Sequence, residues 1–104
     1  MNTKSKNTPT YDKLSKKFGK VTFASHLEAI IETDFESRTA CAKKLGMSPQ
    51  SLHDYIIAKR IPSPSLAGKM AKKLGYSPAA FIELALSDSV KKAGYKYDVK
   101  LESA

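Results

Sequence analysis

The sequence predicts an all-α fold made of short helices joined by tight turns. The Ser-Pro dipeptides at 48–49, 63–64 and 77–78 each place a good N-cap before a proline, which suits the first helical position because it lacks an N–H group. Gly46 and Gly75 each follow an apolar segment, where a left-handed glycine ends a helix. Between these markers apolar residues recur every three or four positions, the spacing of a buried helical stripe.

The first 20 residues form a basic segment. They hold six lysines and one aspartate. Tyr11, Leu14 and Phe18 follow helical spacing within it, and Gly19 can end the short helix that this spacing predicts. We therefore expect an N-terminal arm that carries one extra helix.

The next helix is expected to begin at Thr22 or Ser25. Ser25 and Glu28 have the spacing of a capping box, in which each side chain bonds a free backbone N–H of the other residue. Leu27 and Ile30 begin its buried stripe. The Ser-Pro and glycine markers then bound four further helices, at about residues 39–45, 49–57, 64–74 and 78–86.

The segment 94–101 has a different pattern. Apolar and charged residues alternate strictly from Tyr95 to Leu101, which predicts a short C-terminal β-strand with one buried face. A single strand has unpaired edges and therefore needs a partner. We expect antiparallel pairing with the same segment of a second copy across a two-fold axis. The alternative is pairing with residues 20–23 of the same chain.

An internal repeat lies in the middle of the chain. Residues 42–49 recur as residues 71–78, and the two copies differ only where Met47 is replaced by Tyr76. Two copies are too few for a solenoid, so we interpret them as one helix–glycine–helix turn used twice. The helix after the second copy has almost no polar face, which predicts that it packs in the core.

The first copy has the features of a helix-turn-helix between Arg38 and Ile57. Such a motif needs two helices that cross steeply through a short turn, often with a glycine, and Ala42 and Gly46 fit the close approach and the turn. Ser37 can cap the first helix. Apolar residues at the positions that would lock the two helices together are Cys41, Leu45, Met47, Leu52 and Tyr55.

The second helix of this motif is left with a polar face that has no structural task. We predict that it reads base edges, because Gln pairs with adenine N6 and N7, Ser meets donors or acceptors, and Asp accepts from cytosine N4. The candidate base-reading residues are Ser48, Gln50, Ser51, His53 and Asp54. The basic residues at the ends of the two helices, Arg38, Lys59 and Arg60, are expected to meet phosphates.

On these residues, the stretch from about Phe23 to Leu86 resembles the Cro/lambda-repressor-type (XRE-like) helix-turn-helix family of transcriptional regulators. The resemblance implies a five-helix, lambda-repressor-like DNA-binding domain, usually a dimer on a palindromic operator. There are two departures from the family pattern. Pro49 stands where a base-reading polar side chain is common. Ala58 stands where a glycine often ends the second helix, so either it is left-handed, at a cost of about 1–2 kcal/mol, or the helix ends differently.

Charge and composition agree with a nucleic-acid partner. The formal net charge is +8, and a basic balance of this size attracts phosphate polymers. Cys41 is the only cysteine, so it cannot form a disulfide within the chain. No stretch resembles a signal peptide or a membrane span, and no catalytic or metal-ligand spacing is present. We therefore expect a cytoplasmic protein that is not an enzyme and uses no cofactor or metal.

The sequence thus suggests three segments in the chain and three candidate functions. The parts are a basic arm at 1–20, a helix-turn-helix domain at 21–90, and a tail at 91–104 as a candidate dimerisation element. The favoured function is a homodimeric regulator, most simply a repressor, that binds double-stranded DNA with helix 49–57. The alternatives are an antitoxin-like autorepressor with a partner protein, and a sequence-independent nucleic-acid binder.

Overall fold

The computed structural model describes residues 21–102, which form five helices. The helix predicted at residues 11–18 lies outside the described residues. The helices of the described part are α2 (Phe23–Asp34), α3 (Arg38–Leu45), α4 (Pro49–Ile56), α5 (Pro64–Leu74) and α6 (Pro78–Lys92). The all-α prediction is therefore confirmed for this part of the chain. The last helix is longer than expected and ends at Lys92 instead of Leu86.

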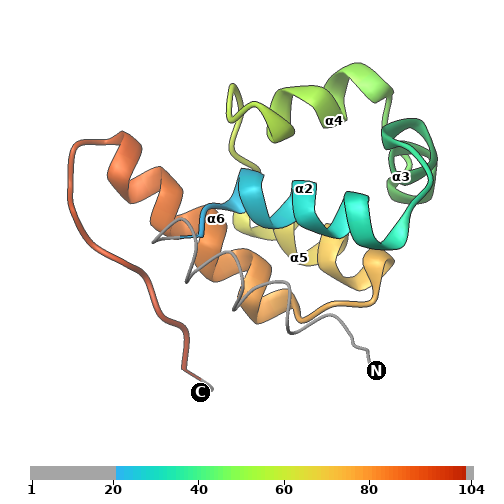
Figure 1. The fold of residues 1–104 in the computed structure, drawn as a ribbon. Coiled ribbons are helices and arrows are strands. Elements are labelled where there is room, and N and C mark those ends of the chain that lie inside the picture. The colour runs from blue at the N-terminus through green and yellow to red at the C-terminus, as the bar shows by residue number, and fades with distance from the viewer. Residues whose placement is uncertain (1–20, 103–104) are drawn as a thin grey trace.

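Helix α2 runs through the middle of the molecule (Figure 1). It packs against α4 on one side and α6 on the other, while α3 contacts both α4 and α5, and α5 lies along α6. The buried core is drawn from all five helices, and its largest fully buried side chains include Phe81, Leu27, Ile30, Leu52 and Met70. This arrangement seats α4 against α2 and α3 against α5.

The start of α2 differs from the predicted capping box. Thr22 is the N-cap: its Oγ1 accepts from the Ser25 backbone N–H at 3.0 Å, and Ser25 Oγ accepts from the Thr22 N–H at 2.9 Å. Glu28 lies further into the helix. Asp88 of α6 accepts from the Phe23 N–H at 2.9 Å, so a distant helix satisfies one further donor at this end. Burial raises the pKa of the Asp88 carboxyl.

An aromatic cluster joins α2 to α6. The ring of Phe81 meets Phe23 edge-on with ring centroids 5.6 Å apart, and it meets His26 edge-on at 5.5 Å. Tyr76 stacks on the same ring and donates its hydroxyl to Asp34 at 2.5 Å. His26 is only 7% exposed, and burial lowers its pKa to about 4. The neutral imidazole therefore belongs to the core at pH 7.

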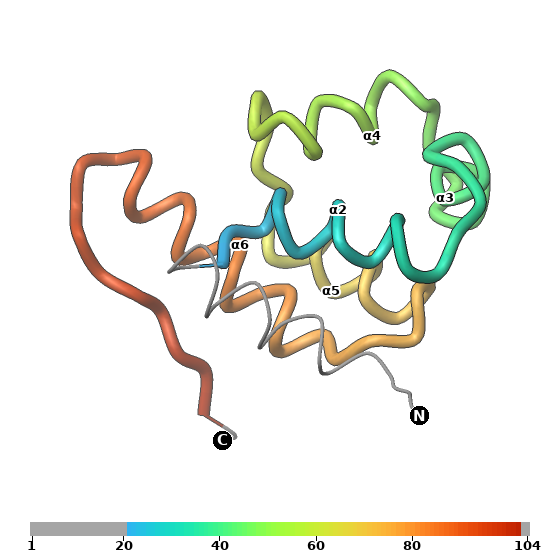
Figure 2. Tube along the Cα trace, in the orientation of Figure 1, coloured from blue at the N-terminus to red at the C-terminus, as the bar shows by residue number. Residues whose placement is uncertain are grey.

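The predicted C-terminal strand is wrong. Residues 21–102 contain no strand, and the chain after α6 returns along that helix as an extended tail (Figure 2). Side chains of α6 take the N–H groups that a strand partner would have bonded: Val99 N–H donates to Ser87 Oγ at 2.7 Å and Leu101 N–H to Glu83 Oε2 at 2.8 Å. Pairing with residues 20–23 is also wrong, because Thr22 and Phe23 begin α2.

Candidate nucleic-acid interface

The turn between α3 and α4 is built by local sequence. Ser37 caps α3, accepting from the Ala40 N–H at 3.1 Å, and Ser48 caps α4, accepting from the Ser51 N–H at 3.1 Å. Gly46 has φ 74°, and the Met47 N–H then bonds the Ala42 carbonyl at 3.0 Å. A residue with a Cβ would be strained at this φ. Both caps and the turn are as predicted.

Buried side chains hold the two helices together. Cys41 and Leu52 are fully buried, and Leu45 and Tyr55 are each 4% exposed. Burial, with a smaller contribution from the charge of Asp34, raises the pKa of the Cys41 thiol to about 11, so the thiol stays protonated as part of the core. The positions predicted to lock α3 to α4 are confirmed. Met47 is partly buried against the same core.

The ammonium group of Lys73 adds a contact that sequence patterns did not indicate. Its Nζ donates to the Leu45 carbonyl at 3.1 Å. This carbonyl is one of the groups that the end of α3 leaves without a helical partner, and a cation is favourable at a helix C-terminus. Helix α5 therefore braces the end of α3 beside the turn.

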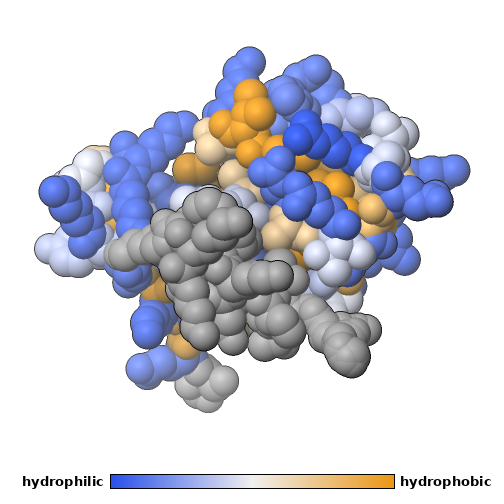
Figure 3. All heavy atoms as spheres, viewed as in Figure 1, coloured by the Kyte–Doolittle hydropathy of each residue, from blue (hydrophilic) through white to orange (hydrophobic). Residues whose placement is uncertain are grey.

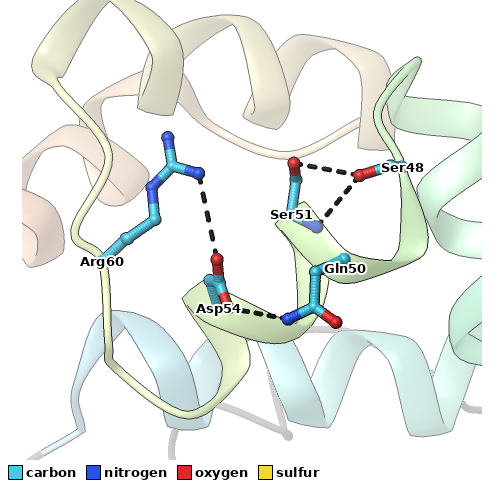
Figure 4. Close-up of polar contacts among 5 residues, drawn as sticks. All are labelled: Ser48, Gln50, Ser51, Asp54 and Arg60. Atoms are coloured by element: carbon cyan, nitrogen blue, oxygen red, sulfur yellow. Dashed lines mark hydrogen bonds and ion pairs between the residues drawn. The ribbon is translucent and has the colours of Figure 1, made fainter.

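The polar face of α4 is connected by hydrogen bonds (Figure 4). The Ser48 hydroxyl donates to Ser51 Oγ at 3.0 Å, and the Gln50 amide nitrogen donates to Asp54 Oδ1 at 3.0 Å. Ser48 and Gln50 are exposed, whereas the Asp54 side chain is only 15% exposed. Because the Ser48 oxygen also caps the helix, Gln50 has the polar side chain most open to an incoming base. The five predicted base-reading residues thus share one element, α4 with its N-cap, but differ in access.

Two of the three predicted phosphate contacts have partners within the protein. Arg38 donates to Glu28 Oε2 at 3.3 Å, and its other guanidinium nitrogen lies 3.5 Å from His53 Nδ1. Arg60 lies over the Tyr55 ring, 5.2 Å from its centroid, with a nitrogen 4.0 Å from Asp54 Oδ2. Both arginine side chains stay about half exposed. These contacts are weak enough in water that either guanidinium can turn to a phosphate.

The loop after α4 resolves the question raised by Ala58. Its φ is 61°, so alanine occupies the left-handed position that glycine usually takes. The Lys59 N–H then bonds the Asp54 carbonyl at 2.9 Å, and the Arg60 N–H bonds it at 3.2 Å. The strained residue thereby turns the chain so that both basic residues follow α4 directly.

Ile57 is a residue of this surface that sequence reasoning missed. It is 53% exposed and lies seven positions after Gln50 and three after Asp54, which places it on the same helical face. That spacing was visible in the sequence. In Figure 3 a hydrophobic area reaches the upper edge of the viewed face, among hydrophilic side chains, in the region where Figure 1 draws the end of α4.

Comparison with known families decides the class of this motif. Residues 37–81 match a family model described as helix-turn-helix. This segment is a helix-turn-helix domain. The resemblance to the Cro/lambda-repressor-type (XRE-like) family is confirmed over the matched residues, and the domain is that of a DNA-binding transcription regulator. No curated protein and no solved structure matches the chain.

Two other kinds of feature are absent from the part of the chain that the structure describes. No three His, Cys, Asp or Glu side chains there are grouped so that they could hold a metal ion. No described helix has the length and apolar character needed to cross a membrane.

Proposed function

We propose that this protein is a sequence-specific transcriptional repressor that reads operator DNA in the major groove with α4. One observation carries the proposal. Helix α4 buries Leu52 and Tyr55 in the core and presents an opposite polar face flanked by Arg38, Lys59 and Arg60. A helix held in this way, with phosphate-binding groups at its ends, suits insertion into the major groove.

The residues of the surface have different roles in this proposal. Gln50, Ser51 and His53 meet base edges, and Ser48 keeps its capping role while its hydroxyl lies beside Ser51. Arg38, Lys59 and Arg60 meet phosphates, which fixes the register of α4 without reading sequence. Ile57 adds an apolar contact of the kind that suits a thymine methyl group. The cytoplasmic location and the 21–90 domain boundaries are part of the same proposal.

We propose further that two copies bind one operator. Major-groove readers of this kind bind half-sites about 34 Å apart, one turn of the double helix, so a two-fold dimer matches a palindrome. We do not assign the association to strand pairing of the tail, because its Val99 and Leu101 N–H groups are bonded to α6. Sedimentation of the protein with its selected duplex should give two chains per palindrome. One chain per palindrome would contradict the dimer but leave the reading role of α4 intact.

Selection of bound fragments from a randomised duplex pool tests the function. The recovered fragments should share a motif, and fluorescence anisotropy should show Gln50→Ala weakening binding to that motif by about 1–3 kcal/mol with little change on random DNA. Ser89→Ala, a change at an exposed α6 residue, is the matched control and should change neither. Equal losses on both duplexes would remove Gln50 from base reading.

The salt dependence of binding tests the phosphate contacts. Arg38→Ala and Lys59→Ala should each weaken binding to every duplex and flatten the plot of log K against log salt by about 0.9 for each phosphate that is no longer neutralised. Lys92→Ala removes the same charge from an exposed position at the end of α6 and should leave the slope nearly unchanged. If all three variants flatten the slope alike and no motif is recovered, the protein is a sequence-independent binder.

A further inference from the structure

We infer that Asp54 is a positioning residue: it does not read a base itself but orients the Gln50 amide so that α4 selects adenine. This inference rests on the proposed function and deepens it by naming the base. The two residues are four positions apart on α4, and Gln50 Nε2 donates to Asp54 Oδ1 at 3.0 Å. Such a spacing brings the two side chains together on one face of a helix.

The chemistry of the carboxylate determines the orientation of the amide. An ionised carboxylate only accepts hydrogen bonds, so the nitrogen of Gln50, and not its oxygen, must face Asp54. Gln50 then has its Oε1 and its second N–H left to offer to a ligand. One acceptor beside one donor matches the N6 amino group and N7 of adenine. Guanine presents two acceptors, N7 and O6, on the same edge, so the Gln50 oxygen would face an acceptor.

Asp54 is itself held in place from several sides. Its side chain is 15% exposed, and its second oxygen lies 4.0 Å from an Arg60 nitrogen. Arg60 in turn rests on the Tyr55 ring, whose position the core determines. The Asp54 backbone carbonyl accepts from the N–H groups of Lys59 and Arg60. A carboxylate that is only 15% exposed and already bonded to the Gln50 amide has little freedom to meet a cytosine amino group, whether or not Arg60 has turned to a phosphate. This argues against its predicted base-reading role.

The test compares the motifs that variants select from the same randomised duplex pool. Gln50→Ala first identifies the operator position that depends on Gln50. We expect the wild type to require adenine there. Asp54→Asn has the same shape but can donate as well as accept, so Gln50 can be held in either orientation. It should lower the adenine-over-guanine preference at that position about tenfold and leave the other motif positions unchanged.

Three further variants keep the result interpretable. Asp54→Glu retains an acceptor-only group and should restore most of the adenine preference. Glu83→Gln makes the same chemical change in α6 and should have no effect on the motif. In the double variant Gln50→Ala/Asp54→Asn, the second change should add nothing to the first. Circular dichroism of each variant at the selection temperature verifies that it is folded.

Each outcome has one meaning. If Asp54→Asn keeps full adenine preference, or if the Gln50-dependent position of the wild type is not adenine, the positioning role is wrong while the repressor proposal stands. If the wild type selects no motif, the proposed function fails and the inference fails with it. A uniform loss of affinity for Asp54→Asn at every position would indicate a merely structural residue and would also overturn the inference.

Discussion

The two copies of the internal repeat form the same turn, but the helices that follow them differ in how they pack. Gly46 and Gly75 have nearly the same backbone angles, φ 74° and ψ 31° against φ 82° and ψ 26°. Met47 and Tyr76 donate back to the equivalent alanine carbonyls at 3.0 and 2.9 Å. In both copies a serine side chain then caps the next helix and proline follows it.

The copies diverge after the proline. Gln50 and Asp54 of α4 correspond in register to Ala79 and Glu83 of α6, while buried Leu52 corresponds to buried Phe81. Helix α4 packs by one face only and keeps a polar face open. Helix α6 packs against α2 and α5, and its Glu83 and Ser87 bond the tail. The turn is therefore set locally, and the residues that follow it decide whether the next helix keeps an open polar face, as α4 does, or packs in the core, as α6 does.

The largest expected effect is a loss of stability at the buried positions that correspond in the two copies. Phe81→Ala should lower the free energy of unfolding by about 3–5 kcal/mol and Leu52→Ala by about 2–5 kcal/mol, because each opens a cavity in the core. Phe81 should cost more, since it holds the whole aromatic cluster. Urea denaturation monitored by circular dichroism measures both. A Phe81→Ala loss below about 1 kcal/mol would contradict the role of α6 in the core.

The next effect is a dependence of stability on pH. It involves the second copy, since the His26 ring packs against Tyr76 and Phe81. Its pKa is about 4 in the folded protein and about 6.5 when unfolded. Between these values the unfolded chain binds more protons, so stability rises with pH. The part of the unfolding free energy that depends on neutral His26 should be fully present above about pH 6.5 and should fall by about 3 kcal/mol as the pH drops to about 4.

Comparing variants isolates the contribution of His26. The raised pKa of Asp88 increases the unfolding free energy at acid pH, which is opposite to the effect of His26. Asp88 is present in both the wild type and the His26→Phe variant, so its effect cancels in the comparison. The difference in unfolding free energy between wild type and His26→Phe should therefore shift in favour of the variant from pH 7 to pH 4. A difference that is constant with pH would show that His26 is not buried in its neutral form.

The two glycines test whether the turns are equivalent. Gly46→Ala and Gly75→Ala should each cost about 1–2 kcal/mol, because alanine is strained in the left-handed region. A Cβ at Gly46 would lie 3.3 Å from Lys73 Nζ, whereas nothing lies within 4 Å at Gly75. Gly46→Ala should therefore cost slightly more by thermal denaturation. The reverse order would contradict the bracing role of Lys73.

The smallest expected effect is an increase in stability. Ala58→Gly relieves the strain of the left-handed alanine after α4, and part of that relief is offset by the greater freedom of glycine in the unfolded chain. The net stabilisation should be about 0.5–1 kcal/mol by urea denaturation. A loss of stability would show that φ 61° at this residue is not strained.

Most of the helical framework could be predicted because its signals are local. The three Ser-Pro caps and the glycines at 46 and 75 determine helix ends from a few neighbouring residues. The tail could not be predicted in the same way. Alternation from Tyr95 to Leu101 is common to a strand and to any extended segment with one covered face, and only the position of Ser87 and Glu83 in space shows which groups bond its backbone.

The candidate site was predictable in its composition but not in its internal contacts. The exposed residues of α4 follow from helical spacing, and the Gln50–Asp54 bond was within reach of the same rule. The approach of Arg60 to Asp54 depends on the left-handed turn at Ala58, for which the sequence left two alternatives. The bond from Lys73 to Leu45 joins residues 28 positions apart, so no local pattern could indicate it.

Amide chemical shifts in the complex show directly which of the two repeat copies meets DNA. The uniformly ¹⁵N-labelled protein is titrated with its selected duplex, and shifts are compared between residues 48–60 and their repeat counterparts at 77–89. We expect large changes along α4 and the loop after it, centred on Gln50, with small changes along α6. Large shifts along α6 with an unperturbed α4 would contradict this expectation, because the copy assigned to the core would then be the one that meets DNA.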